Sequence, residues 1–258
     1  MGDERDIEAS PASVPLVAPL AAVQFLTLVP PIVRRSFTPV EMGWAVGCFP
    51  LVGLLLGGLL AGLDWVLVRV FPSGVSVALV IAAWVIVTGA LHLDGFLDAC
   101  DGLFGGYTPE SRLHIMRDER VGAFGLAGGV LLLLIKVASL AAVSHRAVPL
   151  ILAPTLARWG MTMAVVLFPY ARTEGLGRAM KDHAGWGQAA LATATALGVA
   201  WLAGGWPGLG VAALAGAAAW ALSRFTLARL PGLTGDVYGA ICESIELLTL
   251  LFFAATGI

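Results

Sequence analysis

The sequence predicts an all-α polytopic membrane protein, a helical bundle with about seven to eight transmembrane helices. Of its 258 residues 59% are hydrophobic and only 12% are charged, and the mean hydropathy is +0.89. Soluble domains carry roughly 25% charged residues, so the composition excludes an ordinary soluble protein. Apolar runs of about 20 residues, long enough to cross a bilayer as a helix, recur along the chain. We expect one membrane-embedded domain over residues 14–258, after a disordered polar N-terminus at residues 1–13.

The first apolar run, residues 14–33, is interrupted by Pro15, Pro19, Pro30 and Pro31. Proline lacks the backbone N–H that a helix interior needs, so this run either spans the membrane or lies along its surface. The preceding residues are polar, with four acids and a single Arg, and lack the basic start of a cleavable signal peptide.

Seven later runs are separated by polar or turn-forming segments. Pro72, Ser73 and Gly74 form a connection so short that its flanking helices must be antiparallel. We expect spans at residues 42–71, 75–93, 123–143, 147–170, 188–203, 209–230 and 238–256. The run at residues 14–33 would be the eighth.

Basic residues gather in every second connection, so all of these connections lie on one side of the membrane. The opposite connections, at residues 72–74, 144–146 and 204–208, are short and nearly uncharged, apart from His145 and Arg146. An excess of Lys and Arg marks the cytoplasmic side. We therefore expect a multi-pass protein of the cell inner membrane, surrounded by membrane lipids, with its polar motifs facing the cytoplasm. The basic residues concerned are Arg34, Arg35, Arg112, Arg117, Arg120, Arg172, Arg178, Lys181, Arg224 and Arg229.

The net charge of −2 and the pI near 6.1 argue against a nucleic-acid partner, which would require a basic stripe. Cys48, Cys100 and Cys242 are odd in number and widely spaced. They offer neither a disulfide framework nor a CxxC metal motif, and we interpret them as packing residues.

The densest polar chemistry begins with Asp94, Asp98 and Asp101, spaced four and three residues apart. If the helix from Val75 continues to Asp101, the three carboxylates project from one stripe at its cytoplasmic end. Clustered carboxylates repel one another unless a cation or proton compensates. Hard oxygen ligands suit Mg²⁺, which typically takes one or two carboxylates together with phosphate oxygens. The pattern therefore predicts a magnesium–diphosphate site.

Glycines surround these acids, at Gly95, Gly102, Gly105 and Gly106. Without side chains, they let backbone N–H groups approach a phosphate closely. The alternative is a solvated acidic helix end, for which so many glycines would be unusual.

Asp118 follows as a fourth candidate metal ligand or a residue that positions the base. Arg117 and Arg120 flank it and offer planar guanidinium groups to phosphate oxygens. Their alternative role is topological, as contacts for lipid head groups. His92 is a candidate catalytic base for a hydroxyl proton, or else a hydrogen-bonded structural residue.

Two further polar clusters lie at residues 169–177 and 232–236. The first contributes Arg172 to phosphate binding, with Lys181 following on the same loop. In the second, Thr234, Gly235 and Asp236 precede the last helix, where they could cap it, cradle an anion or add a metal ligand.

Four ionisable residues fall within predicted spans. Glu243 and Glu246 share a helix face inside the bilayer, where acids are costly and therefore often functional; Glu243 is a further candidate metal ligand. Lys136 and Arg158 need partners inside the bundle, and we expect ion pairs that lock helices together.

Together these motifs resemble the cobalamin synthase family, the adenosylcobinamide-GDP ribazoletransferases. The resemblance covers nearly the whole chain and is highly specific as a combination. It rests on residues 24–27, 49–53, 92–95, Asp98, 101–106, Ile115, Met116, Asp118, Arg120, Gly122, Gly125, 175–177 and 233–236.

The resemblance implies a late step of vitamin B12 synthesis. α-Ribazole, or its 5′-phosphate, would replace GMP on adenosylcobinamide-GDP and give adenosylcobalamin or its 5′-phosphate. The family requires Mg²⁺, which some of Asp94, Asp98, Asp101 and Asp118 would hold. His92, or an acid that does not bind the metal, would act as the base. The family resemblance is also compatible with a homo-oligomer.

Two alternatives come from other classes. A CDP-alcohol phosphotransferase of phospholipid synthesis also uses spaced aspartates, but with a wider gap and an Ala-Arg that this chain lacks. A cation-coupled membrane transporter is the non-enzymatic alternative, although carriers more often place acids near the bilayer midplane.

Overall fold

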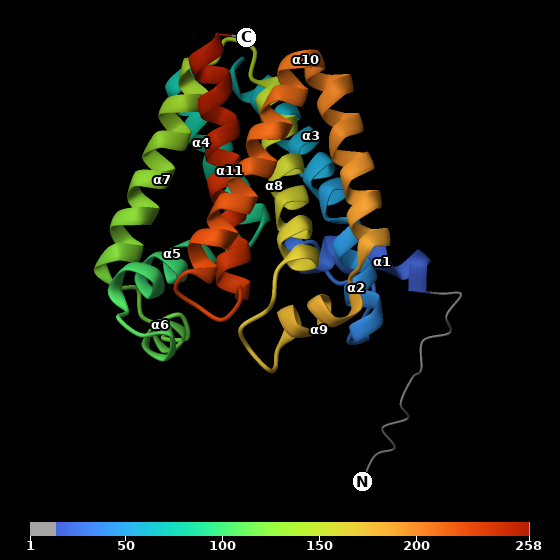
Figure 1. Ribbon diagram of the computed structural model, residues 1–258. Coiled ribbons are helices and arrows are strands. Elements are labelled where there is room, and N and C mark those ends of the chain that lie inside the picture. Colours follow the sequence, from blue (N-terminus) through green and yellow to red (C-terminus); the bar gives the residue numbers. More distant parts are fainter. Residues whose placement is uncertain (1–13, 258) are drawn as a thin grey trace.

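The computed structural model describes residues 14–257, so the predicted disorder of residues 1–13 lies outside the described part. Long helices run side by side, and short helices gather at their lower end in Figure 1, which we call the polar end. The long helices are α3 (Phe49–Leu67), α4 (Ser73–Val87), α7 (Ala123–Ala142), α8 (Ala147–Leu167), α10 (Trp186–Leu227) and α11 (Gly235–Thr256). The short ones are α1 (Val14–Leu26), α2 (Pro39–Gly47), α5 (Leu91–Cys100), the π-helix η1 (Asp101–Gly105), α6 (Pro109–Ile115) and α9 (Leu176–His183).

The predicted fold class is confirmed. Within residues 14–257, five helices are long and apolar enough to cross a membrane, or six if α4 and α5 count as one bent span. α10 holds 42 residues and leaves helical geometry at Gly205, where φ is 55°. Figure 1 shows its two arms running in opposite directions from this bend. With the arms counted separately, the number of spans reaches the predicted seven.

The first apolar run does not form an eighth span. α1 ends at Leu26, and its 13 described residues reach about 20 Å, less than the roughly 30 Å hydrocarbon core. Pro30 and Pro31 prevent the helix from continuing, and the Gln24 amide holds the returning chain through the N–H and carbonyl of Val33. α1 lies across the polar end (Figure 1).

The helix predicted to run from Val75 to Asp101 is broken, which corrects the sequence analysis. α4 and α5 meet at an angle of 89°, because Gly89 and Ala90 adopt positive φ angles of 60° and 55°. The Thr88 hydroxyl donates to the Trp84 carbonyl, and the N–H of Leu28 donates to the Val87 carbonyl. These two carbonyls near the end of α4 therefore have hydrogen-bond partners although the helix stops there. After the bend, α5 lies across the polar end.

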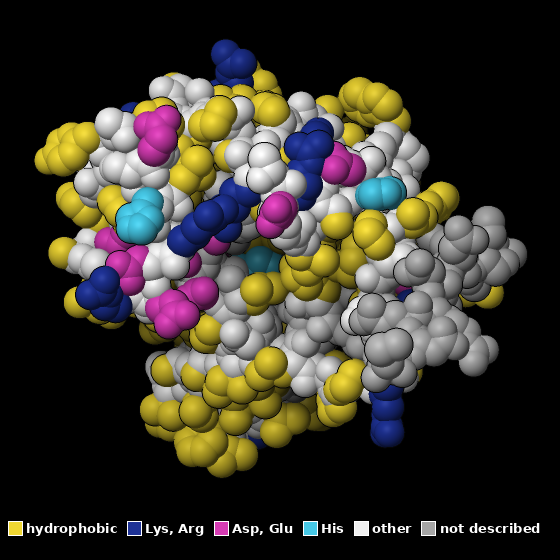
Figure 2. Space-filling model, turned by 90° about the horizontal axis from the view of Figure 1, so that it is seen from below, with side chains coloured by type: hydrophobic (Ala, Val, Ile, Leu, Met, Phe, Trp, Pro, Cys, Tyr) yellow, Lys and Arg dark blue, Asp and Glu magenta, His cyan; other side chains and the backbone are white. Residues whose placement is uncertain are grey.

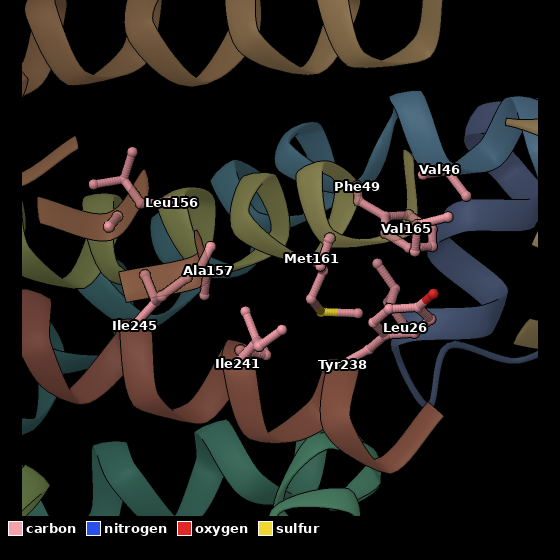
Figure 3. Close-up of a cluster of buried hydrophobic side chains, with 14 of the residues drawn as sticks. Leu26, Val46, Phe49, Leu156, Ala157, Met161, Val165, Tyr238, Ile241 and Ile245 are labelled. Atoms are coloured by element: carbon pink, nitrogen blue, oxygen red, sulfur yellow. The ribbon is translucent and has the colours of Figure 1, made fainter. Parts of the chain in front are cut away.

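α8 is the inner helix of the bundle, and α10 faces outward. In the most apolar stretch of α8, 72% of the residues are buried, whereas in the most apolar stretch of α10 only 22% are buried. Figure 3 shows Met161 of α8 and Tyr238 and Ile241 of α11 projecting into the space between the two helices. α8 is thus packed on several sides, while the outer helices present apolar side chains to the surroundings, as membrane spans do.

Candidate active site

The site begins where α5 crosses the start of α11. A side chain on Gly95 would come within 3.1 Å of the Asp236 Cα, and one on Gly239 within 2.8 Å of the His92 carbonyl. These glycines let the two backbones touch. The contact brings Asp94 and Asp98 of α5 close to Asp236, although 138 residues separate Asp98 from Asp236 in the sequence.

The two polar clusters at residues 169–177 and 232–236 also meet. A β-bridge joins Tyr170 and Leu233: the N–H of Leu233 donates to the Pro169 carbonyl, and the N–H of Ala171 donates to the Leu233 carbonyl, both at 2.8 Å. Gly232 is required here, because a Cβ on it would lie 2.6 Å from the Ala171 nitrogen. The bridge places Arg172 beside the first turn of α11.

Arg172 and Thr234 fix the carboxylate of Asp236. The guanidinium donates to Oδ2 at 2.7 Å, and the Thr234 hydroxyl donates to the same oxygen at 3.1 Å. Thr234 also accepts from the N–H of Val237, so its predicted capping role is confirmed. The ion pair between Arg172 and Asp236 could not be anticipated, since the sequence analysis gave both residues to the ligand.

Asp94 and Asp98 differ from Asp236 in that neither has a cationic partner in an ion pair within residues 14–257. Asp94 is exposed and Asp98 half-buried. Asp94, Asp236 and Asp101 are the anionic neighbours of Asp98, with Arg172 as the cationic one. The arrangement is an excess of negative charge at the polar end, which we call the acidic cluster (Asp94, Asp98 and Asp236).

The carboxylate of Asp101 binds backbone N–H groups instead of joining the acidic cluster. One carboxylate oxygen accepts from the N–H of Gly122 at 2.7 Å, and the other from the N–H of Gly125 at 2.8 Å. Asp101 is 7% exposed and caps the start of α7, whose first N–H groups lack helical partners. Asp101 therefore faces α7, and the predicted stripe of three acids is limited to Asp94 and Asp98.

In the loop before α7, Asp118 and Arg120 form an ion pair with each other. The Arg120 guanidinium donates to both Asp118 oxygens at 3.0 Å and lowers the pKa of this carboxyl. Asp118 is not brought to the acidic cluster. Arg117 is exposed and belongs to the electrostatic surroundings of Tyr170, next to Arg172.

Other predicted phosphate ligands have structural partners. The Lys181 ammonium donates to the Val166 carbonyl at 2.9 Å, near the end of α8, and burial lowers the pKa of Lys181. Gly102 and Gly106 are buried against α6: a Cβ on Gly102 would meet the Met116 side chain, and one on Gly106 would lie 2.9 Å from the Arg112 backbone. Gly105 is half-buried and Gly235 exposed.

The four ionisable residues of the spans form one buried network. Lys136 binds Glu243 and, at 2.6 Å, Glu246, while Arg158 binds the other oxygen of Glu246. All four are at most 6% exposed. The predicted interhelical ion pairs are therefore confirmed, and Glu243 has Lys136 as its partner.

His92 is attached to this network. Arg158 Nη2 lies 3.3 Å from His92 Nδ1, and His92 Nε2 is buried with no hydrogen-bond partner among the residues that the structure describes. A guanidinium only donates, so Nδ1 accepts and the neutral ring carries its proton on Nε2. In this state neither ring nitrogen is free to accept a proton, which argues against the predicted catalytic base.

A cavity of about 190 Å³ opens beside the acidic cluster. Asp94, His92 and Asp236 contribute to one part of its wall. The rest is mainly apolar and includes Phe25, Phe49, Leu91, Met161, Met180 and Tyr238. Figure 2 shows a hollow in this face, with acidic and basic side chains around it. The apolar members were missed because they come from six separate helices.

For a cation, the acidic cluster supplies carboxylates of the kind that Mg²⁺ prefers, and substrate oxygens typically complete its coordination. Within residues 14–257, no three His, Cys, Asp or Glu side chains are close enough together to bind a metal by themselves. A cation held by these carboxylates would therefore need further ligands, such as the oxygens of a phosphate.

Comparison with known proteins matches residues 18–254 to the family model described as cobalamin-5-phosphate synthase. Similar curated proteins are named adenosylcobinamide-GDP ribazoletransferase. Those of Geotalea daltonii and Deinococcus radiodurans are 38% and 42% identical to this chain, covering 92% and 90% of it and 96% and 83% of the relatives. No solved structure matches. The chain therefore belongs to the cobalamin-5-phosphate synthase family.

Proposed function

We propose that this protein transfers the adenosylcobinamide-phosphate group from adenosylcobinamide-GDP to α-ribazole, or to α-ribazole 5′-phosphate, and releases GMP. Family membership and the names of the relatives support this role in the final assembly of cobalamin. The structural observation that supports it best is the acidic cluster, which borders a cavity and has Arg172 as its one ion-pair partner among residues 14–257. This arrangement suits a cation and a diphosphate next to a bound nucleoside.

Asp94 and Asp98 are the residues we assign to Mg²⁺, because their carboxylates have no competing ion pair with any residue that the structure describes. Bound there with the substrate, Mg²⁺ would offset the negative charge of the diphosphate and of the departing phosphate. Asp101, Asp118 and Glu243 are engaged by backbone amides, Arg120 and Lys136 respectively, so we leave them out of the ligand set.

In the reaction, a ribose hydroxyl oxygen bonds to the phosphorus attached to the cobinamide. The bond from this phosphorus to the bridging oxygen of the diphosphate breaks, and GMP leaves with that oxygen. We assign Asp236, whose orientation Arg172 and Thr234 fix, as the base that accepts the proton of the attacking hydroxyl. Transfers of this kind depend on positioning and charge neutralisation, which the acid and the guanidinium supply.

Of the three arginines predicted to bind phosphate, Arg120 and Arg172 form ion pairs, whereas Arg117 forms none within residues 14–257. It is exposed and lies in the electrostatic surroundings of Tyr170, whose loop also carries Arg172. A guanidinium can bind two phosphate oxygens at once. We assign Arg117 to the GMP phosphate and Arg172 to the orientation of Asp236.

We further assign the polar end to the cytoplasmic side of the cell inner membrane. Arg112, Arg117, Arg172 and Arg178 lie in loops and short helices at this end, and basic loops mark the cytoplasm. Nucleotide substrates would reach the site from that side, while exposed apolar side chains on α7 and α10 contact lipid tails.

The test is release of GMP by the purified protein in detergent, with adenosylcobinamide-GDP, α-ribazole or its 5′-phosphate, and Mg²⁺. We expect GMP and an adenosylcobalamin product in equal amounts, and no GMP when ribazole is omitted or EDTA is added. GMP release without ribazole, or turnover in EDTA, would contradict the proposal. Asp182→Asn is the matched control for acid variants, because Asp182 pairs with Arg178 on the surface of α9, and it should retain the full rate.

A further inference from the structure

The residues that line the cavity beside the acidic cluster indicate which part of a substrate can bind there. Its wall is mainly apolar, and its volume of about 190 Å³ is several times the roughly 30 Å³ of one water molecule. A corrin ring is far too large for it. A flat two-ring heterocycle is the part of the proposed substrates that matches the cavity in size.

Two heterocycles meet this description, the guanine of the GDP group and the base of ribazole. Guanine carries several donors and acceptors, and an apolar cavity would leave most of them unpaired at a large cost in binding. The base of ribazole is a dimethylbenzimidazole. One ring nitrogen bonds to ribose, the other is an acceptor without a proton, and the rest of its surface is apolar.

Two residues of the cavity wall, His92 and Tyr238, carry a donor that could suit this acceptor. His92 is 2% exposed, and its buried Nε2 has no hydrogen-bond partner within residues 14–257. Because Arg158 donates to Nδ1, the Nε2 atom of the neutral ring carries the proton. A buried donor without a partner is costly, and a ligand with one acceptor would remove that cost.

We propose that the cavity binds the base of ribazole and that His92 Nε2–H donates to its unsubstituted ring nitrogen. Arg158 is the positioning residue, since its contact with Nδ1 fixes the tautomer. Asp94 and Asp236 lie at the same cavity, so the attached ribose would extend toward the acidic cluster. This inference rests on the proposed function and adds the residue that recognises the base.

The test compares ribazole with its indole analogue, in which C–H replaces the unsubstituted nitrogen. For the wild-type protein, KM for the analogue should be about tenfold higher or more, the effect of one buried hydrogen bond, with a smaller change in kcat. In His92→Leu, KM for ribazole should rise by a similar factor, and the ratio of the two KM values should fall close to one.

Two further variants separate recognition from general damage. Tyr238 also lines the cavity, and its buried hydroxyl has no hydrogen-bond partner in the described part of the chain. Tyr238→Phe should keep the wild-type ratio, because we assign recognition of the ring nitrogen to His92. Arg158→Lys keeps a cation for Glu246 but loses the reach to Nδ1, and it should lower the ratio. A merely structural role of Arg158 would change the stability and leave the ratio as it is.

Equal KM values for ribazole and the analogue in the wild-type protein overturn the inference, whether or not His92→Leu folds. Loss of the discrimination in Tyr238→Phe but not in His92→Leu also overturns it. Failure of the proposed function looks different, because the wild-type protein would then release no GMP in response to ribazole.

Discussion

Two groups of charged residues each include residues of α11, and they differ in how their charges are paired. In the buried network, Lys136, Arg158, Glu243 and Glu246 are almost fully buried, and every one of them has an ion-pair partner. In the acidic cluster, Asp94 and Asp98 are exposed or half-buried and have no cationic partner in an ion pair within residues 14–257. The first group is complete without a ligand, whereas the second is not.

Burial and pairing therefore separate structural from functional charges better than residue type does. Removing one member of a buried ion pair is strongly destabilising, because the charge of the other member then remains uncompensated. Carboxylates at the edge of the membrane can stay unpaired in water, ready for a cation and a phosphate.

Glu246→Gln should destabilise the protein by about 3–5 kcal/mol, because both Lys136 and Arg158 would keep only weaker compensation for their buried charges. We expect the thermal midpoint in detergent to fall by roughly 10 °C. The control is Glu110→Gln, which removes an exposed acid on α6. An unchanged midpoint in Glu246→Gln would show that the network has no structural role.

Asp101→Ala should lower stability by about 1–3 kcal/mol, since the N–H groups of Gly122 and Gly125 lose their acceptor. The Mg²⁺ concentration that gives half-maximal turnover should stay the same for the molecules that remain folded. Normal stability combined with a weaker response to Mg²⁺ would instead place Asp101 among the metal ligands, as its spacing in the sequence suggests.

The smallest effect concerns Glu41 in α2, which accepts from the Arg35 guanidinium and from the N–H of Thr38. The Arg35 pair lowers the pKa of Glu41 to about 2. Since the folded pKa is depressed, the carboxylate stabilises the protein above its ordinary pKa of about 4.3, and this contribution is lost as the pH falls toward 2.

Glu41→Gln should therefore lower stability by on the order of 1 kcal/mol at pH 7, because Arg35 is partly exposed and water screens the pair. The difference in thermal midpoint between the variant and the wild-type protein should shrink between pH 5 and pH 3. A difference that is constant over this range would mean that the charge of Glu41 does not contribute.

Most of the fold could be predicted from the sequence, because apolar runs and short turns report directly on spans. The bend at Gly89 could not, since a single glycine in an apolar run is compatible with a straight helix. Its consequence is large: α5 turns across the polar end, and Asp101 reaches the start of α7 instead of a shared stripe. The later glycines Gly122 and Gly125 were the available signal, because they lie where a carboxylate needs close access to backbone N–H groups.

The candidate site could be predicted in part. Thr234 caps α11, and the two polar clusters meet as their common side of the membrane suggested. The partner of His92 could not be foreseen, because Arg158 lies 66 residues away and spacing does not report such contacts. The same holds for the cavity, whose apolar wall comes from residues that look like ordinary core positions.

The central claim is that the acidic cluster performs the transfer while the buried network holds the bundle together. Its most direct test is the rate of ribazole-dependent GMP release by Asp98→Asn, compared with Asp182→Asn and the wild-type protein at equal folded concentration. We predict that Asp98→Asn keeps the wild-type thermal midpoint and loses at least about 100-fold in rate. A near-normal rate in this variant would contradict the account.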